Sequence, residues 1–438
     1  MLKCLQIQFL LFAGISHLIN MDSLAPQTHK FDVIIVGAGP AGSSCALFLA
    51  KAGRRVLLVD KAKFPREKIC GDAVSGKSIN IIRELGLLDE LNATTHGIVE
   101  GVKLVAPNGK EVTVPFQKAI GMDCAGYCLP RSETDNILAQ AAAKEKNITF
   151  IQNFNADQMI KNSQGAVIGI EGGIPPKVEK YYSRVVVGAD GAASVVSRNA
   201  GLKGNPPEHN YMGIRGYYNE VEGLENNIEL FFIDEVLPGY LWIFPLGRKR
   251  ANVGLGILAS DMKNRKIHPN NLLENAIRNS PKLKDRFTNS AREGKIGAWT
   301  IPLGSHKKQL HGEGWVLLGD AASLVDPFSG EGFGNAASSG KFAAQTIDSA
   351  LKTVGEKEFL DSEALEPYAK KVETELYPEM ETTYKLQRAT RFKFMLNLFI
   401  SKAADKLEFR QMIVDMLASN EQKKKVEDPL FYLRLLLP

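Results

Sequence analysis

The order of hydrophobic and polar residues predicts a strand, a helix and a second strand near the start of the chain. Residues 31–36 form a short run rich in β-branched side chains, and this run ends at Gly37. Residues 40–52 are mostly small and apolar, as in a helix that packs closely on a sheet, and residues 55–59 form a second apolar run. Two buried strands joined by a helix are the usual beginning of a parallel sheet.

The rest of the chain shows a helical pattern in some segments and a sheet pattern in others. A helix is expected over residues 132–144, opened by a capping box of Ser132 and Asp135. From Tyr211 to Ile257, aromatic and apolar residues alternate with polar ones without helical periodicity, which predicts an antiparallel sheet. The other expected elements are strands at 166–170, 181–187 and 315–318, a helix from about Gly332, and helices with basic residues after Gly355.

Composition indicates an ordinary globular chain. Of the 438 residues 44% are hydrophobic, enough for two or three domains with a large core. The net charge of +5 is mild for this length, so we expect no nucleic acid as a partner. The five cysteines are scattered, and no second Cys or His pair stands near Cys124 and Cys128 at zinc-ligand spacing. We therefore expect neither a disulfide framework nor a metal site.

Residues 1–29 form an extension that is treated separately from the fold. Its apolar run from Leu5 to Ile19 follows a single Lys3 and is short for a bilayer span. The run lacks an evident A-x-A cleavage site, and Met21 lies only ten residues before the first expected strand. A start codon placed too early is the preferred interpretation, ahead of a weak membrane anchor and of a cleaved signal.

A glycine-rich turn follows the first expected strand. Residues 37–42 have the spacing G-x-G-x-x-G, in which Gly37 permits a tight turn, Gly39 lets a pyrophosphate approach the backbone, and Gly42 allows close helix–strand packing. The N–H groups at the start of the helix are oriented to bind phosphates. Asp60 ends the next strand, where a carboxylate can accept hydrogen bonds from ribose hydroxyls. Together these features predict a dinucleotide site in preference to a structural glycine turn.

A second motif, nearly three hundred residues later, favours FAD over NAD. The strand at 315–318 ends in Gly319 and Asp320, and Asp320 is suited to hydrogen bonds with ribitol hydroxyls. The N–H groups and positive dipole end of the following helix suit the flavin edge that becomes negative on reduction. On their own these residues could equally be a strand–turn–helix with packing glycines. The residues that open this helix and are expected to bind the cofactor are Pro327, Gly330, Glu331 and Gly332.

A third motif, Asp190-Gly191, completes a set that resembles a known superfamily. The three motifs in this order are similar to those of the aromatic hydroxylases and geranylgeranyl reductases, over about residues 30–345. The resemblance implies that Asp190 and Gly191 contact FAD and take part in binding a nicotinamide cofactor. It also implies that Arg131, in an R-x-x-x-D pattern with Asp135, contacts FAD, although a solvated arginine is the alternative.

Two further segments resemble the geranylgeranyl reductase family in particular. Residues 68–72 are similar to its K-x-C-G-G/D segment, which implies that Lys68 and Cys70 lie near the flavin and the substrate. A packed, buried cysteine is the alternative. Residues 238–245 are similar to its P-x-x-Y-x-W-x-F-P segment, with one residue fewer before Tyr240. Strand alternation would place Tyr240, Trp242 and Phe244 on one face, either in the core or along a long apolar cavity.

The expected architecture is an α/β fold with a discontinuous, Rossmann-like FAD-binding domain and an inserted antiparallel-sheet substrate domain. The FAD-binding domain comprises residues 30–95, 126–204 and 296–355, the substrate domain comprises 96–125 and 205–295, and residues 356–438 form a C-terminal helical region. That region interleaves apolar residues with Lys385, Arg388, Arg391, Lys393 and Lys402. A solvated basic face is preferred slightly over a helix that lies on an anionic membrane. We expect a cytoplasmic protein, with peripheral membrane contact as the alternative.

The expected function is that of an FAD-dependent oxidoreductase, with NAD(P)H or another reductant as electron donor. It would reduce C=C bonds of a prenyl chain or another large apolar substrate. Cys70, Tyr240 and Trp242 are the expected catalytic residues, with Cys70 or a water beside it on the proton route. An FAD-dependent monooxygenase or halogenase is the main alternative, because the cofactor motifs are shared. A non-enzymatic prenyl carrier on the same fold, like the Rab escort and GDI proteins, is the third.

Overall fold

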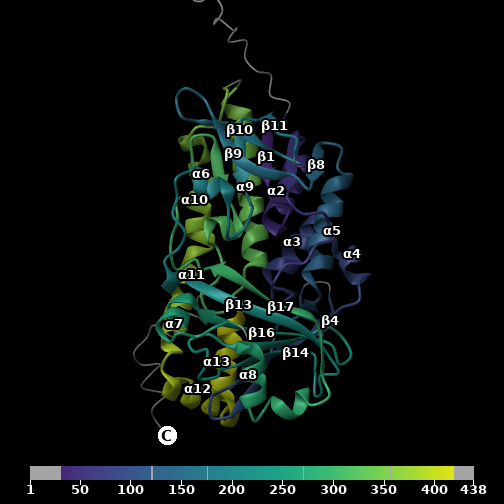
Figure 1. Cartoon of the computed structure of the whole chain (residues 1–438), viewed down its shortest axis with the longest axis vertical. Coiled ribbons are helices and arrows are strands. Elements are labelled where there is room, and N and C mark those ends of the chain that lie inside the picture. The colour runs from purple at the N-terminus through teal and green to yellow at the C-terminus, as the bar shows by residue number, and fades with distance from the viewer. Residues whose placement is uncertain (1–30, 120–121, 175, 270, 356, 419–438) are drawn as a thin grey trace, which may run out of the picture.

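The computed structural model describes residues 31–119, 122–174, 176–269, 271–355 and 357–418. Two large sheets lie toward opposite ends of the long axis of the molecule, and helices flank both of them (Figure 1). The mixed α/β class expected from the sequence is confirmed. The interpretation of residues 1–29 falls outside the described residues.

The first sheet is the predicted parallel sheet. Its order is β18-β19-β12-β1-β2-β8, and every neighbouring pair is parallel except β18 with β19. Every residue of β1 and β2 is buried, which shows that both faces of the sheet are covered. The strands are β1 (Val33–Val36), β2 (Val56–Asp60), β8 (Ile148–Gln152), β12 (Val185–Gly188), β18 (His311–Gly312) and β19 (Trp315–Leu317).

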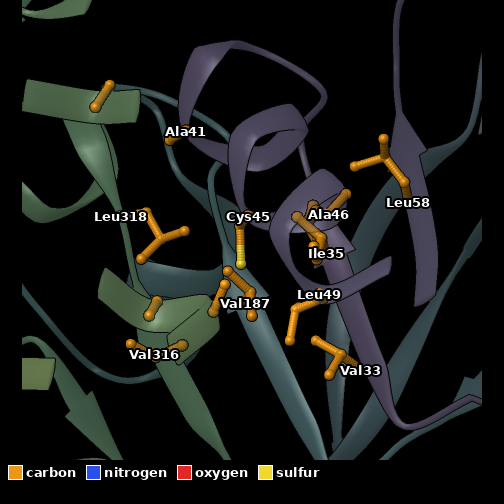
Figure 2. Close-up of a cluster of buried hydrophobic side chains, with 14 of the residues drawn as sticks. Val33, Ile35, Ala41, Cys45, Ala46, Leu49, Leu58, Val187, Val316 and Leu318 are labelled. Carbon is orange, nitrogen blue, oxygen red and sulfur yellow. The ribbon is translucent and has the colours of Figure 1, made fainter. Parts of the chain in front are cut away.

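Two helices of small residues cross closely beside this sheet. At Gly340 in α9, an added Cβ would lie 2.4 Å from the Ala41 carbonyl oxygen of α2, so the small residues permit this approach. Aliphatic side chains of α2, β1 and the neighbouring strands fill the space around Cys45 (Figure 2). A three-stranded sheet of order β11-β10-β9 also packs on this layer. These elements are α2 (Pro40–Lys51), α9 (Phe333–Thr353), α5 (Arg131–Lys144), α6 (Val195–Asn199), β9 (Asn155–Lys161), β10 (Val167–Gly173) and β11 (Glu179–Tyr182).

The second sheet has seven strands in the order β17-β13-β16-β15-β14-β5-β6. The antiparallel pairing predicted between Tyr211 and Ile257 is confirmed, while β5 runs parallel to β14. The expected domain boundary at 295/296 falls inside β17, which pairs with β13 along most of its length. The strands are β5 (Gly101–Val105), β6 (Glu111–Pro115), β13 (Asn210–Asn219), β14 (Asn227–Phe231), β15 (Leu241–Pro245), β16 (Ala251–Leu258) and β17 (Ala291–Pro302).

A small sheet of order β3-β7-β4 contacts elements of both larger layers. Its strand β3 packs on α3 and α9, and β4 packs on β14 and β15. The loop of residues 68–72 leads directly into β3 and therefore lies between the two large sheets. The elements here are β3 (Ala73–Ser75), β4 (Gly97–Val99), β7 (Gly126–Cys128), α3 (Lys77–Leu85) and α4 (Leu88–Asn92).

The expected helical region after Gly355 is confirmed within the described residues. Helices α12 and α13 pack on β6 of the seven-stranded sheet, and α10 packs on α9. No helix among residues 31–418, apart from the few undescribed positions, is long and apolar enough to cross a membrane. The remaining helices are α7 (Ala259–Asn264), α8 (Leu272–Asn279), α10 (Ser362–Glu375), α11 (Tyr377–Ala389), α12 (Lys393–Asp405) and α13 (Leu407–Ala418).

Two local predictions were wrong. The helix predicted over residues 132–144 is present as Arg131–Lys144, but the predicted capping box is not, because the N-cap residue is Pro130 and no side chain caps the helix. Asp135 does not complete a capping box, because its carboxylate is taken by the guanidinium of Arg131 at 2.6 and 2.7 Å. The single strand predicted over 181–187 is divided between β11 and β12, which belong to different sheets.

Candidate active site

One cavity of about 1400 Å³ extends from the glycine-rich turn after β1 to the aromatic side chains of β15. All but three of the expected site residues line it. Those outside the lining are Gly42, Gly319 and Pro327. Those that line it are Gly37, Gly39, Asp60, Lys68, Cys70, Arg131, Asp190, Gly191, Tyr240, Trp242, Asp320, Gly330, Glu331 and Gly332.

The glycine-rich turn leaves room for a ligand at one position and for none at two others. Gly37 has a φ of +100°, and an added Cβ there would lie 2.4 Å from the Ala189 carbonyl oxygen. At Gly42, a Cβ would lie 1.8 Å from the Gly37 carbonyl oxygen, so this glycine serves the packing of α2 on β1. At Gly39 the nearest atom would be Arg66 Nη2 at 3.6 Å, and the position opens into the cavity.

Asp60 stabilises the same turn. Its Oδ2 accepts a hydrogen bond from the Ala38 N–H at 2.7 Å, and its Oδ1 accepts one from the Ala62 N–H at 2.8 Å. The carboxylate is 8% exposed and lines the cavity. Because each carboxylate oxygen can accept a second hydrogen bond, both remain able to bind the hydroxyls of a ribose.

Asp190 has an unsatisfied acceptor at the edge of the cavity. Its Oδ2 accepts from the Val195 N–H at 2.6 Å, whereas its Oδ1 is buried and has no hydrogen-bond partner among the described residues. Burial raises the pKa of this carboxyl. A buried acceptor without a donor is costly, so the site fits a ligand that brings a hydroxyl or an N–H group.

Arg131 is not the solvated arginine considered as the alternative, because only 7% of it is exposed. It donates two hydrogen bonds to Asp135, which also pairs with Arg66 at 2.9 Å. Burial opposes the positive charge of the Arg131 guanidinium, but Asp135 and the nearby Cys70 outweigh burial and raise the pKa of Arg131. A fixed positive charge therefore stands on the cavity wall.

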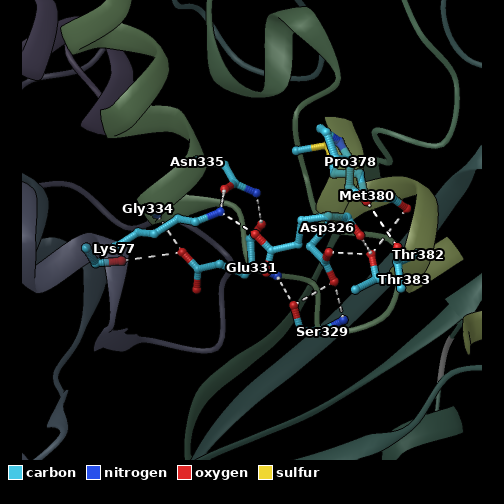
Figure 3. Close-up of polar contacts among 12 residues, drawn as sticks. Lys77, Asp326, Ser329, Glu331, Gly334, Asn335, Pro378, Met380, Thr382 and Thr383 are labelled. Carbon is cyan, nitrogen blue, oxygen red and sulfur yellow. Dashed lines mark hydrogen bonds and ion pairs between the residues drawn. The ribbon is translucent and has the colours of Figure 1, made fainter. Parts of the chain in front are cut away.

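The loop between η3 (Gly319–Ala322) and α9 is held by a polar network (Figure 3). Asp326 accepts hydrogen bonds from the Ser329 N–H at 2.7 Å and from the Thr383 hydroxyl of α11 at 2.6 Å. Glu331 accepts from the Gly334 N–H at 2.5 Å in the first turn of α9, and burial raises its pKa. The network holds the N-terminal end of a 21-residue helix, with its positive dipole end, against the cavity.

Lys68 and Cys70 belong to the loop that leads into β3, and both line the cavity. The Lys68 ammonium lies 4.5 Å from the centre of the Trp299 ring, and burial lowers its pKa while Asp320 partly opposes this effect. Cys70 is partly exposed, whereas the other cysteines among the described residues, Cys45, Cys124 and Cys128, are buried. Cys70 is thus less buried than the packed cysteine that was considered as the alternative.

The aromatic residues of 240–244 lie on one side, as alternation predicts. The ring centres of Tyr240 and Trp242 are 6.4 Å apart and those of Trp242 and Phe244 are 6.2 Å apart, and all three side chains line the cavity. The Tyr240 hydroxyl donates to the Ser329 carbonyl oxygen of the loop before α9. The aromatic row thus contacts the loop expected to face the flavin.

Sequence reasoning missed a group of polar residues behind this row. Asp72 and Asn252 are fully buried, and Tyr217 is 7% exposed. Asn252 is the only polar side chain within the apolar strand β16, and that contrast was the signal available in the sequence. Its Oδ1 accepts from Trp242 Nε1 at 2.9 Å, so this group fixes the aromatic wall as well as the loop.

Comparison with known proteins assigns the family. Residues 30–374 match the family model described as "FAD binding domain". The menaquinone reductase of Mycobacterium tuberculosis is 30% identical over 73% of this chain and 76% of its own length. The chain belongs to the FAD-binding-domain family. It is an FAD-dependent oxidoreductase, and this relative is a reductase.

Other relatives confirm the resemblance to geranylgeranyl reductases. Digeranylgeranylglycerophospholipid reductase 2 of Methanopyrus kandleri is 29% identical over 90% of this chain and 94% of its own length. A geranylgeranyl bacteriochlorophyll reductase-like protein of Thermoplasma acidophilum shares the fold, with a TM-score of 0.77, 24% identity and coverage of 91% and 98% of the two chains. The fold is also that of a flavin-dependent brominase, with a TM-score of 0.73, 22% identity and coverage of 88% and 93%.

Proposed function

We propose that this oxidoreductase reduces C=C bonds in the isoprenoid chain of a large apolar substrate. The observation that carries the proposal is the continuous cavity between the dinucleotide-binding turn and the aromatic row of Tyr240, Trp242 and Phe244. A mostly apolar cavity with a few converging polar groups is typical of sites for apolar ligands. The substrates named for two relatives, menaquinone and digeranylgeranylglycerophospholipid, both carry isoprenoid chains.

The residues around the cavity fit both ends of FAD. The Gly39 backbone would approach the pyrophosphate, Asp60 would bind the ribose, and Asp190 would use its free Oδ1 as an acceptor. At the other end, Asp320 and the start of α9 would hold the ribitol and the flavin edge. Arg131 stands between these ends as a fixed cation.

Reduction of an alkene requires a hydride at one carbon and a proton at the other. Bound FAD, once reduced, supplies the hydride. The protein has three tasks, namely to hold the double bond, to exclude water and to deliver the proton. The aromatic row would orient the chain and exclude water, and the Cys70 thiol would carry the proton on Sγ or order a water that does so. NAD(P)H is proposed as the reductant, with Asp190 and Gly191 at its binding site.

Membrane contact is proposed separately for the start of α12. Phe392 and Phe394 are 66% and 64% exposed, and neighbouring exposed apolar side chains can mark a membrane contact. The neighbouring Arg391 and Lys393 pair with Asp261 and Asp234, which leaves less basic charge for anionic lipid. We propose a cytoplasmic protein that contacts membranes peripherally through these rings, and vesicle co-sedimentation of Phe394→Ser against wild type tests this.

Anaerobic turnover tests the reductase proposal. The purified protein, reduced with dithionite, is mixed with a geranylgeranyl lipid, and the product mass is recorded. A gain of two hydrogens per reduced bond without oxygen supports the proposal. A product that forms only with O₂ and contains oxygen or halogen would assign the chain to the monooxygenases or halogenases. Prenyl-lipid binding by protein that retains no FAD would favour a carrier.

A further inference from the structure

A buried polar group connects the Cys70 loop to the seven-stranded sheet. Asn252 of β16 donates a hydrogen bond to the Cys70 carbonyl oxygen at 2.7 Å and another to Asp72 Oδ2 at 2.7 Å. Its Oδ1 accepts from Trp242 Nε1 at 2.9 Å. The Tyr217 hydroxyl of β13 donates to the same Asp72 Oδ2 at 2.8 Å. Asn252 therefore fixes the backbone of Cys70 relative to the ring of Trp242.

The bonds around Asp72 favour an ionised carboxylate. Its three partners all donate, since the Arg131 backbone N–H also donates to Oδ1, at 3.2 Å. A neutral carboxyl carries a hydrogen on one oxygen and needs an acceptor for it. Of these partners, the Arg131 N–H and the Asn252 NH2 group can only donate. A hydrogen on Asp72 therefore finds an acceptor among them only at the Tyr217 hydroxyl oxygen or at Asn252 Oδ1, and either choice changes the present pattern of bonds.

Asp72 is also held in an unusual backbone conformation and without an ion pair. Its φ is +69°, a value that residues other than glycine rarely adopt, and its side chain is fully buried. Among the described residues no Lys or Arg side chain forms a salt bridge with it. The charged and titratable groups that face it from the surrounding elements are Arg131 on α5, Arg215 and Tyr217 on β13, and Cys128 on β7.

We propose that Asp72 is a positioning residue whose ionised carboxylate, through Asn252, holds the Cys70 loop against Trp242, and whose protonation releases the loop. Burial raises the pKa of Asp72 to about 6, even though Arg215 and the hydrogen bonds from Asn252 and Tyr217 act against burial. Asp72 therefore changes between its protonated and ionised forms within a pH range that is accessible to experiment. The proposal rests on the proposed function only in that Cys70 serves alkene reduction.

The test follows the reactivity of Cys70 in the resting holoenzyme and so does not depend on turnover. Rate constants for alkylation of Cys70 by iodoacetamide are measured by peptide mass spectrometry over a range of pH. Asp72→Asn imitates the protonated state. We expect variant and wild type to react at equal rates below the pKa of Asp72 and the variant to react several-fold faster above it. The ratio of the two rates should change with a single inflection near pH 6, where Asp72 of wild type ionises.

Two further variants keep the test decisive if Asp72→Asn folds poorly. Tyr217→Phe removes one donor to the carboxylate, so the inflection of the pH dependence should move upward by about one pH unit. Asp123→Asn, at an exposed aspartate before β7, should leave the pH dependence of wild type unchanged. A wild-type profile without an inflection, or a ratio of rates that does not vary with pH, would overturn the proposal. If the alkylation rates follow the expected pH dependence but the enzyme does not reduce alkenes, the proposed function is wrong and the positioning role of Asp72 stands.

Discussion

Replacing Asp72 by Asn should change how the stability of the protein depends on pH. The carboxyl is fully buried, and its pKa in the folded protein is raised from 3.8 to about 6. A raised pKa means that the folded state binds the proton more tightly than the unfolded state does. The stabilisation from this proton is fully present below pH 3.8 and is lost as the pH rises toward 6.

The size of the effect follows from the difference between the two pKa values. The shift corresponds to about 3 kcal/mol of stability lost by wild type across the whole transition. Between about pH 4.5 and about pH 8, the part of the loss that can be measured is about 2 kcal/mol. Asp72→Asn carries no titrating proton at this position. Relative to wild type it should therefore gain about 2 kcal/mol over this range, whatever constant cost the substitution adds.

Urea unfolding of both proteins with FAD in excess gives the comparison. Tryptophan and flavin fluorescence are followed together, since coincident transitions justify a two-state free energy of unfolding. The quantity to plot is the difference in this free energy between variant and wild type at each pH. A difference that stays constant from acid to alkaline pH would refute the raised pKa. If wild type instead becomes more stable relative to the variant as the pH rises, the folded protein stabilises Asp72 in its ionised form.

Three further predictions concern FAD binding at the glycine-rich turn, the aromatic wall and the delivery of a proton. Gly39→Val should fold but lose FAD in the flavin absorbance spectrum, whereas Gly42→Ala should lower the melting temperature because its Cβ would lie 1.8 Å from the Gly37 carbonyl oxygen. Trp242→Ala should lower the turnover of long-chain substrate while FAD stays bound. If the variant unfolds instead, at a cost of about 3–5 kcal/mol, the Trp242 ring belongs to the hydrophobic core and does not form a substrate wall. Cys70→Ala should keep flavin reduction but slow alkene reduction about 100-fold or more, and Cys70→Ser should be less impaired. Unchanged turnover by Cys70→Ala would exclude the thiol from the proton route.

Local sequence patterns were sufficient to predict the elements that are expected to hold the cofactor. The turn at Gly37, the strand that ends in Asp60 and the helix after Asp320 are each defined within a few consecutive residues, so periodicity and glycine spacing indicate them. The capping box failed for a physical reason, because the Ser132 and Asp135 pattern is present but Arg131 binds the Asp135 carboxylate. A spacing pattern does not show which of two partners a side chain will choose.

The network around Asp72 was not predictable from local patterns, because its partners are distant in sequence. Asp72 and Tyr217 are separated by 145 positions, and Asp72 and Asn252 by 180. Only the pairing of β13 with β16 brings Tyr217 and Asn252 together, in direct register with one another. The sequence contained the components, a polar residue in an apolar strand and an aspartate after a family-like cysteine, without a sign that they meet.

The choice between reductase and oxygenase has to be made on the substrate side of the cavity. The fold is shared with a flavin-dependent brominase, so the elements expected to hold FAD do not distinguish the two classes. What can differ is the substrate side, which in the proposed function consists of the Cys70 loop and the aromatic row. Asn252 binds both through one amide, at 2.7 Å to Cys70 and 2.9 Å to Trp242. If the proposed function is right, a substitution at this position changes the proton route and the substrate wall together, and we therefore expect this network to decide the chemistry of the site.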